Sequence, residues 1–423
     1  MSAAVQTGSA QDSTAKAFLS RHDGLASRVP DNARRAAATA LFRAHGLPTL
    51  REEAWHYTSM RGLAGTVFSE PLLPVGDEGK LAAQLPDVDV PRAVFVDGRF
   101  NAKLSSLPDS LAVTTGAPAE ATFARPDRER IVALSEMLAE DGLTFTVPAG
   151  VDAGTLMLAS IGTDAHGRPV SFHPRHRIDL AEGARLALLE VCVGTGIYLH
   201  APVMEARVAA KAHLTHIRLQ CEATTAFHLS TLYTDVAEDA AYEGFTLVAG
   251  ARLARAEIHA RLSGPRASVT LNGAQLLGGQ QHADITTVVA HDAPDGASRQ
   301  TIKHVVTDRA RGVFQGRIEV ARIAQKTDGY QMNQALLLSE HAEVDCKPQL
   351  EIYADDVKCS HGATIGALDP EQLFYLRARG IPLDQARALL VRAFLSEALD
   401  PVAHEAGCEL LETAVADWWS LRA

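Results

Sequence analysis

The sequence predicts a mainly β protein in which helical regions flank a long core of strands. From about Thr144 onward, short strand patterns separated by Gly, Asp, Asn and Pro recur for more than 200 residues. No long helical pattern interrupts this stretch, which argues against a doubly wound parallel sheet. Helical patterns occupy the residues on either side. We therefore divide the chain into a mainly helical region at residues 1–143, a β core at 144–368 and a helical region at 369–423.

The N-terminal region places apolar residues at helical spacing. In "DNARRAAATALFRAHGLP", Asp31 stands where the N-cap of a helix is expected, and Gly46 and Pro48 are expected to end that helix. Trp55 in "LREEAWHYTSMRGL" is expected to anchor packing. The stretch "RAVFVDGRF" predicts a short hairpin that turns at its Asp-Gly pair, and "DRERIVALSEMLAEDG" predicts another helix.

The core alternates apolar and polar residues, as strands with one buried face do. In "ARAEIHARL", Ala256, Ile258 and Ala260 fall on one face, while Arg255 and Glu257 fall on the other. A sandwich, a barrel and a β-helix all fit this pattern. Stacked short strands joined by tight turns suit a solenoid, whose coils shield each other's edges. The sequence shows no regular period, so these residues alone leave the three architectures open.

The C-terminal region returns to helical spacing in "DPEQLFYLRARGIPLDQARALLVRAFLSEAL", followed by a last helix in "GCELLETAVADWWSL". Apolar residues near helical spacing include Leu389, Leu390, Ala393 and Phe394, with charged residues on the other side. Such a helix could cap the end of a solenoid or present an apolar face to a partner.

Composition narrows the classes of function. The net charge of −11 and the isoelectric point near 5.9 argue against a nucleic-acid-binding surface. The five cysteines include no CxxC pair, which favours reduced thiols and a cytoplasmic, bacterial setting. The N-terminus lacks the pattern of a secretory signal, and no apolar run approaches the roughly 18 residues of a membrane span.

Motifs of self-sufficient enzymes are missing. The sequence contains no GxxxxGK[ST], no GxSxG and no HExxH, and "GTGIYL" lacks the third glycine of a dinucleotide fingerprint. We therefore expect no intrinsic nucleotide site. Cys192, Cys221 and Cys408 are interpreted as buried small apolar residues, and His228 as a residue of a strand face.

The stretch "DDVKCSHGATIG" places Cys359 and His361 two residues apart. In an extended strand these side chains project from the same face. Thiolate and imidazole are ligands for iron–sulfur clusters and zinc, but two ligands are half a site. Either another strand or another chain completes the site, or the pair is a buried cysteine beside a turn histidine.

Residues 311–381, from "RGVFQGRIEV" through "CSHGAT" to "YLRARGI", resemble the core of the SufB/SufD family of iron–sulfur cluster assembly proteins. Weaker likeness reaches upstream through "SFHPRHRIDLAEGA" and "REEAWHYTSM". SufB-like sequences generally read "CEHEAT" at the motif, whereas SufD-like ones read "CSHGAT". Ser360 therefore places this chain closest to the SufD branch.

The resemblance implies a right-handed parallel β-helix with helical regions at both ends. It implies a scaffold subunit that pairs with SufB through the β-helices and binds the ATPase SufC through C-terminal helices, here at Leu389, Leu390, Ala393 and Phe394. The ATPase activity would then reside in SufC. A transient Fe–S cluster shared with SufB would bind at His361 and Cys359. Further partners would be a cysteine desulfurase system and acceptor proteins, and an isolated chain could form a homodimer.

Two other hypotheses stay open. The chain could be a purely structural partner, with SufB supplying every cluster ligand. It could also be a β-helix enzyme acting on polysaccharides, which would need carboxylates and basic residues clustered along one groove. The candidates for such a groove, Asp345, Glu351, Asp355 and Lys358, alternate with expected core positions and fit ordinary outward faces.

Overall fold

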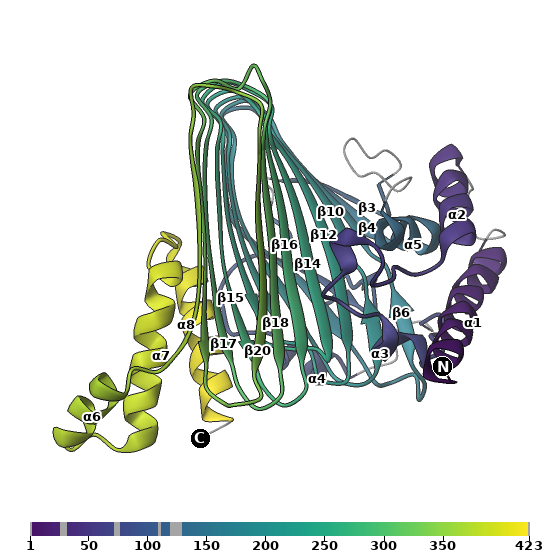
Figure 1. Ribbon diagram of the computed structural model, residues 1–423. Coiled ribbons are helices and arrows are strands. Elements are labelled where there is room, and N and C mark those ends of the chain that lie inside the picture. The colour runs from purple at the N-terminus through teal and green to yellow at the C-terminus, as the bar shows by residue number, and fades with distance from the viewer. Residues whose placement is uncertain (1, 26–31, 72–76, 109–110, 119–128, 422–423) are drawn as a thin grey trace.

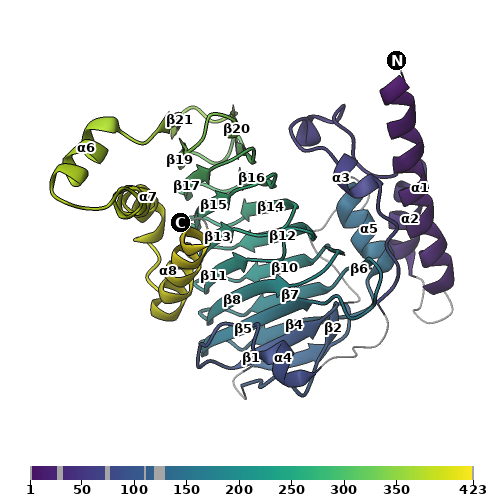
Figure 2. The ribbon, with the colours of Figure 1, turned by 90° about the horizontal axis from the view of Figure 1, so that it is seen from below.

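The computed structural model describes residues 2–25, 32–71, 77–108, 111–118 and 129–421. Its centre is a solenoid of stacked parallel strands. Helices from the N-terminal part of the chain lie on one side, and the C-terminal helices lie on the other (Figures 1 and 2). The mainly β architecture and the β-helix implied by the family resemblance are confirmed, and the sandwich and barrel are excluded.

Two sheets form the walls of the solenoid. Strands pair in parallel throughout, except for the antiparallel pairs β1–β2 and β3–β4. Sheet B has the order β2 (Arg99–Phe100), β1 (Arg92–Val96), β5 (Asp152–Gly162), β8 (Arg185–Gly194), β11 (His213–Gln220), β13 (Ala241–Val248), β15 (Ser268–Leu277), β17 (Ala297–Val306), β19 (Asp328–Leu337) and β21 (Lys358–Ala367). Sheet A has the order β20 (Glu343–Ile352), β18 (Arg311–Val320), β16 (His282–His291), β14 (Leu253–Leu262), β12 (Phe227–Val236), β10 (Val203–Val208), β7 (Arg175–Leu180), β4 (Gly142–Val147) and β3 (Ala112–Thr115), with β6 (Val170–Phe172) and β9 (Tyr198–His200) attached beside β12.

The coils turn at residues in the left-handed region of backbone space. Each such residue stands two positions before a strand of sheet B and is followed by a small residue. The φ angles lie between 55° and 61°, and the positions recur every 27 to 31 residues: Lys211, Asp239, Arg266, Asp295 and Lys326. Glycine is the usual choice for this conformation. Gly150 and Gly183 hold the equivalent positions in the first coils, but charged residues adopt the conformation from Lys211 onward. The repeat therefore has no residue type that recurs at a fixed spacing in the sequence.

The interior of the solenoid combines apolar packing with buried polar contacts in both its earlier and its later coils. The earlier coils pack aliphatic side chains such as Leu188 and Leu232 beside a buried ion pair between Arg218 and Glu190. In the later coils, Thr287 Oγ1 donates to Gln300 Oε1 at 2.7 Å, and a histidine bridges neighbouring amides further along. Buried polar groups are tolerated when they bond each other, so the later coils can carry polar residues to the end of the stack.

Helices occupy both flanks of the solenoid. None of the described helices is both long and apolar enough to cross a membrane. Asn32 caps α2 by accepting from the Arg35 backbone N–H at 2.8 Å, and the expected cap Asp31 lies outside the described residues. The segment 1–143, expected to be mainly helical, also supplies β1, β2 and β3. The helices are α1 (Ser2–Leu25), α2 (Ala33–His45), η1 (Glu53–Trp55), α3 (Arg61–Ala64), α4 (Glu78–Ala82), α5 (Arg130–Leu138), α6 (Pro370–Ala378), α7 (Leu383–Leu399) and α8 (Glu405–Ser420).

A buried ion pair fastens the N-terminal region to sheet A. Arg255 on β14 bonds the carboxylate of Asp284 on β16 at 2.5 Å, and its guanidinium lies 4.2 Å from the ring centre of Trp55. Thr58 also donates to Asp284. Both charged side chains are buried. The expected anchoring role of Trp55 is therefore confirmed, because Trp55 belongs to a buried apolar cluster and also contacts the Arg255 cation.

Replacing Arg255 by methionine is expected to lower the free energy of unfolding by about 3–5 kcal/mol, because the Asp284 carboxylate would stay buried without its cation. Urea titration followed by tryptophan fluorescence would measure the change. The double variant Arg255→Met, Asp284→Asn should lose less than the sum of the single variants, since the charge of Asp284 is removed together with its cation. Glu257, which also pairs with Arg255, keeps its contact with His259 in both variants. Additive losses would show that the two side chains are not coupled.

Candidate functional site

The solenoid ends at two strands that each have an unpaired edge. β20 is the last strand of sheet A and β21 the last of sheet B, and no described strand pairs with their outer edges. Figure 2 shows the two strands together at this end of the stack. Apolar side chains are exposed here, with Ile365 51% and Tyr353 67% accessible. An exposed strand edge with apolar neighbours is a template for pairing with another chain.

The "CSHGAT" motif lies on β21 at this open end. Cys359 is in register with Gly329 of β19, and His361 with Gln331. Because alternate residues of a strand share a face, Cys359 and His361 both project toward the inside of the last coil. The strand predicted for this stretch is present.

Cys359 is half-buried. Cys359 packs beside Ile318 and Ala354. Its Sγ atom also lies close to Gly329 of the neighbouring strand, since a Cβ added to this glycine would be 3.3 Å from the sulfur. Burial raises the pKa of the Cys359 thiol, and a hydrogen bond from the Gly329 backbone offsets this only in part. The thiol is therefore protonated at neutral pH. A thiol must lose its proton before it can bind a metal, so burial makes Cys359 a weaker candidate ligand than an exposed thiol would be.

His361 is exposed at the mouth of the solenoid. In register behind it lies a ladder of buried polar residues, in which Gln331 Nε2 is 3.5 Å from Gln300 Oε1. Gln331 Oε1 has no hydrogen-bond partner among the described residues. The imidazole thus occupies the last position of a polar tract, where a neutral ring nitrogen can serve as a metal ligand.

A second cysteine at this end escaped the sequence reasoning. Cys346 lies on β20 and packs against the apolar cluster that contains Phe314 and Ala342. Burial raises the pKa of its thiol to about 11. The alternation in "EVDCKPQLEI" places Cys346 on the inward face, and that signal could have paired it with the motif. The open end therefore presents an imidazole beside two protonated thiols.

The C-terminal helices place the four residues expected to dock SufC in different surroundings. Helix α7 packs on β15 and β17, with Val391 and Leu395 buried against them. Phe394 also faces the solenoid, where Lys303 Nζ lies 4.6 Å from the centre of its ring. Leu389 and Ala393 are exposed, and Leu390 is half-buried. The four residues lie on one side of the helix, but only Leu389 and Ala393 are exposed there.

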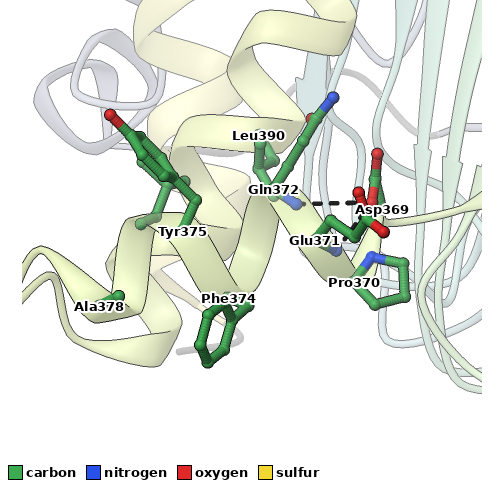
Figure 3. Close-up of a pocket in the computed structure, with 9 residues that line it drawn as sticks. Asp369, Pro370, Glu371, Gln372, Phe374, Tyr375, Ala378 and Leu390 are labelled. Carbon is green, nitrogen blue, oxygen red and sulfur yellow. Dashed lines mark hydrogen bonds between the residues drawn. The ribbon is translucent and has the colours of Figure 1, made fainter.

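The sequence reasoning assigned SufC docking to the C-terminal region 369–423, which includes α6, but named only residues of α7. No residue of this helix is buried, and Phe374 and Tyr375 are 73% and 57% exposed. A hollow between α6 and α7 brings Leu390 together with these aromatic residues, as Figure 3 shows. Asp369 caps the helix by accepting from the Glu371 backbone N–H at 2.8 Å. A capped helix that buries nothing and exposes two aromatic rings suits recognition by a partner.

Comparisons with known proteins agree with this geometry. Residues 161–394 match the family described as "SUF system FeS cluster assembly, SufBD core domain". The chain is 36% identical to the iron–sulfur cluster assembly protein SufD of Escherichia coli over 85% of this chain and 86% of the relative. It is 31% identical to the chloroplastic protein ABCI7 of Arabidopsis thaliana over 86% and 76%, and 28% identical to a SufBD family protein of Synechocystis over 87% of each chain. The chain therefore belongs to the SufB/SufD family of iron–sulfur cluster assembly proteins.

Proposed function

We propose that this chain is the SufD-type scaffold subunit of a complex with SufB and the ATPase SufC. One observation carries the proposal: the "CSHGAT" motif faces the open, unpaired end of the solenoid. A metal or cluster site completed within one chain would need further ligands close to the motif. Here no described strand pairs with the outer edges of β20 and β21, and a SufB β-helix can extend both sheets from these edges.

In this proposal the nascent cluster is cargo that the two subunits hold together. His361 supplies one ligand from this chain, SufB supplies the others, and Cys359 is a reserve ligand that must first lose its proton. A site divided between two chains can bind iron and release it again more readily than a closed site within one chain. Sulfur would come from a cysteine desulfurase system, and acceptor proteins would take the finished cluster.

SufC would supply the ATP site, and the C-terminal helices would transmit its movement. Helix α7 is packed on sheet B, whereas α6 projects from it (Figures 1 and 2). A displacement of α6 and α7 by a closing SufC pair would reach β15 and β17 directly. Movement of these strands would shift the end of the solenoid at which the cluster forms.

A proline at position 363 tests the pairing with SufB. The Lys358 backbone N–H donates to Thr327 O at 2.8 Å, toward the interior of sheet B. Along a strand the N–H groups alternate in direction, so the N–H of Ala363 points to the free edge. Proline there removes an edge donor without breaking the pairing with β19, as proline on natural edge strands does.

We expect Ala363→Pro to weaken co-purification with SufB by at least about tenfold, which corresponds to roughly 1.4 kcal/mol. Ala363→Val is the matched control, because it enlarges the side chain but keeps the N–H group, and it should retain SufB. Circular dichroism would establish that both variants are folded. A folded proline variant that binds SufB as the wild type does would exclude pairing through this edge.

A further inference from the structure

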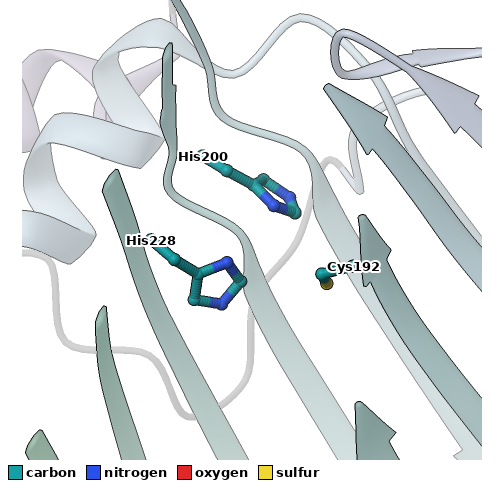
Figure 4. Close-up of side chains that lie close together, drawn as sticks. All are labelled: Cys192, His200 and His228. Atoms are coloured by element: carbon teal, nitrogen blue, oxygen red, sulfur yellow. The ribbon is translucent and has the colours of Figure 1, made fainter. Parts of the chain in front are cut away.

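A second group of potential metal ligands lies inside the solenoid. Cys192 comes from β8, His200 from β9 and His228 from β12, and one ligand atom of each lies within 4.8 Å of the others. Figure 4 shows the two rings and the cysteine converging from separate strands. All three side chains are buried. The register brings His228 directly beside His200, so one coil of the solenoid separates these two residues in the sequence.

The Glu222 carboxylate contacts the Nδ1 atoms of both imidazoles. Glu222 Oε1 lies 3.1 Å from His200 Nδ1, and Glu222 Oε2 lies 2.7 Å from His228 Nδ1. Gln220 Nε2 donates to the same carboxylate at 2.9 Å. Histidines that bind metals usually engage a carboxylate through their other ring nitrogen in this way, because that contact fixes the tautomer and the orientation of the ring.

The nitrogens on the opposite side of both rings lack partners. Nε2 of His200 and Nε2 of His228 form no hydrogen bond with any described residue. A buried polar atom without a partner is destabilising and calls for an explanation, such as a bound ion. His200 Nδ1 is hydrogen-bonded to Glu222, whereas His228 Nδ1 is in ionic contact with the same carboxylate without a hydrogen bond. Each ring keeps a nitrogen without a partner among the described residues, and one nitrogen of each ring lies within 4.8 Å of the Cys192 sulfur.

We propose that Cys192, His200 and His228 form a buried site for a borderline-soft transition-metal ion such as Zn²⁺ or Fe²⁺, with Glu222 orienting the imidazoles. Thiolate and imidazole are the preferred ligands of such ions. Metal binding would release the proton of the Cys192 thiol, and the resulting thiolate and the Glu222 carboxylate would together offset a divalent cation in a low-dielectric interior. The strands β14, β16 and β18 separate β12 from β20, so this site is distinct from the open end.

Anaerobic metal analysis of the full chain tests the site. We would use a His361→Ala background so that the proposed cluster site cannot contribute. The chain would be unfolded with a chelator, refolded with excess Co²⁺ or Zn²⁺ and dialysed, and its metal content measured by mass spectrometry. About one ion per chain is expected, and Co²⁺ should show the intense near-ultraviolet charge-transfer band of a thiolate ligand.

Cys192→Ala should lose the charge-transfer band and at least about nine-tenths of the metal, since one of three ligands is gone, and His228→Gln should lose a similar share of the metal. Cys221→Ala is the matched control, because Cys221 neighbours this region but packs with the apolar cluster under α8. It should bind metal as the parent does. A folded parent chain that retains no ion, or equal retention by Cys192→Ala and the parent, would overturn the site and leave the proposed pairing with SufB untouched.

Discussion

Replacing His361 by alanine is expected to abolish cluster assembly on the complex with SufB and SufC while leaving the complex intact. His361 is exposed on the inward face of the terminal strand, and the structure gives its ring no hydrogen bond to a described residue that folding would need. Its removal should therefore spare stability. If it supplies one ligand of a site shared by two chains, the cluster loses a bond that the remaining residues cannot replace.

The measurement is anaerobic reconstitution of the co-purified complex, read by visible absorption and by iron and sulfide content. We expect the variant to hold less than about a tenth of the wild-type cluster, as loss of a ligand at a labile site implies. Ser360→Ala is the matched control, because Ser360 is on the same strand but projects from the opposite face. Cys359→Ser should have the smaller effect of the two motif variants, since its thiol is protonated and half-buried.

A wild-type amount of cluster in an intact His361→Ala complex would reverse the assignment. The chain would then be a structural subunit that shapes the complex, and SufB would carry every ligand. The same result would leave the paired strand edges in place, so the Ala363→Pro experiment would still report on how the two subunits meet.

Patterns within single segments of the sequence predicted the strands and helices, but they did not predict how the strands stack on one another. Alternation identified strands such as "ARAEIHARL", and helical spacing identified both flanking regions. The stacking itself escaped detection because the turn positions are filled by Lys211, Asp239 and Arg266, which share a backbone conformation but no chemistry. The small residue that follows each of them, such as Ala212 or Ala240, was the available signal. Only the family resemblance selected the β-helix.

The two candidate sites differ in the same way, because one lies on a single strand and the other combines residues from three strands. Two residues on one strand face, Cys359 and His361, could be paired from their spacing alone. That they lie at an open end depends on where the stack of coils stops, which no local pattern records. Cys192, His200 and His228 come from three strands, and only the register between coils brings them together. From the sequence, Cys192 was therefore interpreted as a buried apolar residue and His228 as a strand-face residue, and His200 was given no role.

Helix α7 illustrates a further limit. Apolar residues occur around much of this helix, so its sequence does not tell which side meets the solenoid and which stays free. The structure turns Phe394 toward Lys303 and leaves Leu389 exposed. The ring of Phe394 is thereby engaged within the chain itself, whereas Phe374 and Tyr375 of α6 are exposed.

Replacing Phe374 by aspartate is therefore expected to remove SufC from the complex while SufB stays bound. The Phe374 side chain is 73% exposed on a helix that buries no residue, so its replacement should leave the fold unchanged. A central aromatic residue of a protein interface typically contributes 2 kcal/mol or more, so binding should fall by at least about 30-fold. A buried aspartate in the interface would weaken it further.

Pull-down of SufC at several concentrations would measure this loss. Ile323→Asp is the matched control, because Ile323 is 69% exposed but lies on the turn between β18 and β19, away from α6 in the sequence and in the fold. It makes the same chemical change at a similar exposure and should retain SufC. If Phe374→Asp binds SufC normally and Leu389→Asp does not, the exposed side of α7 is the docking surface, and α6 then serves another partner.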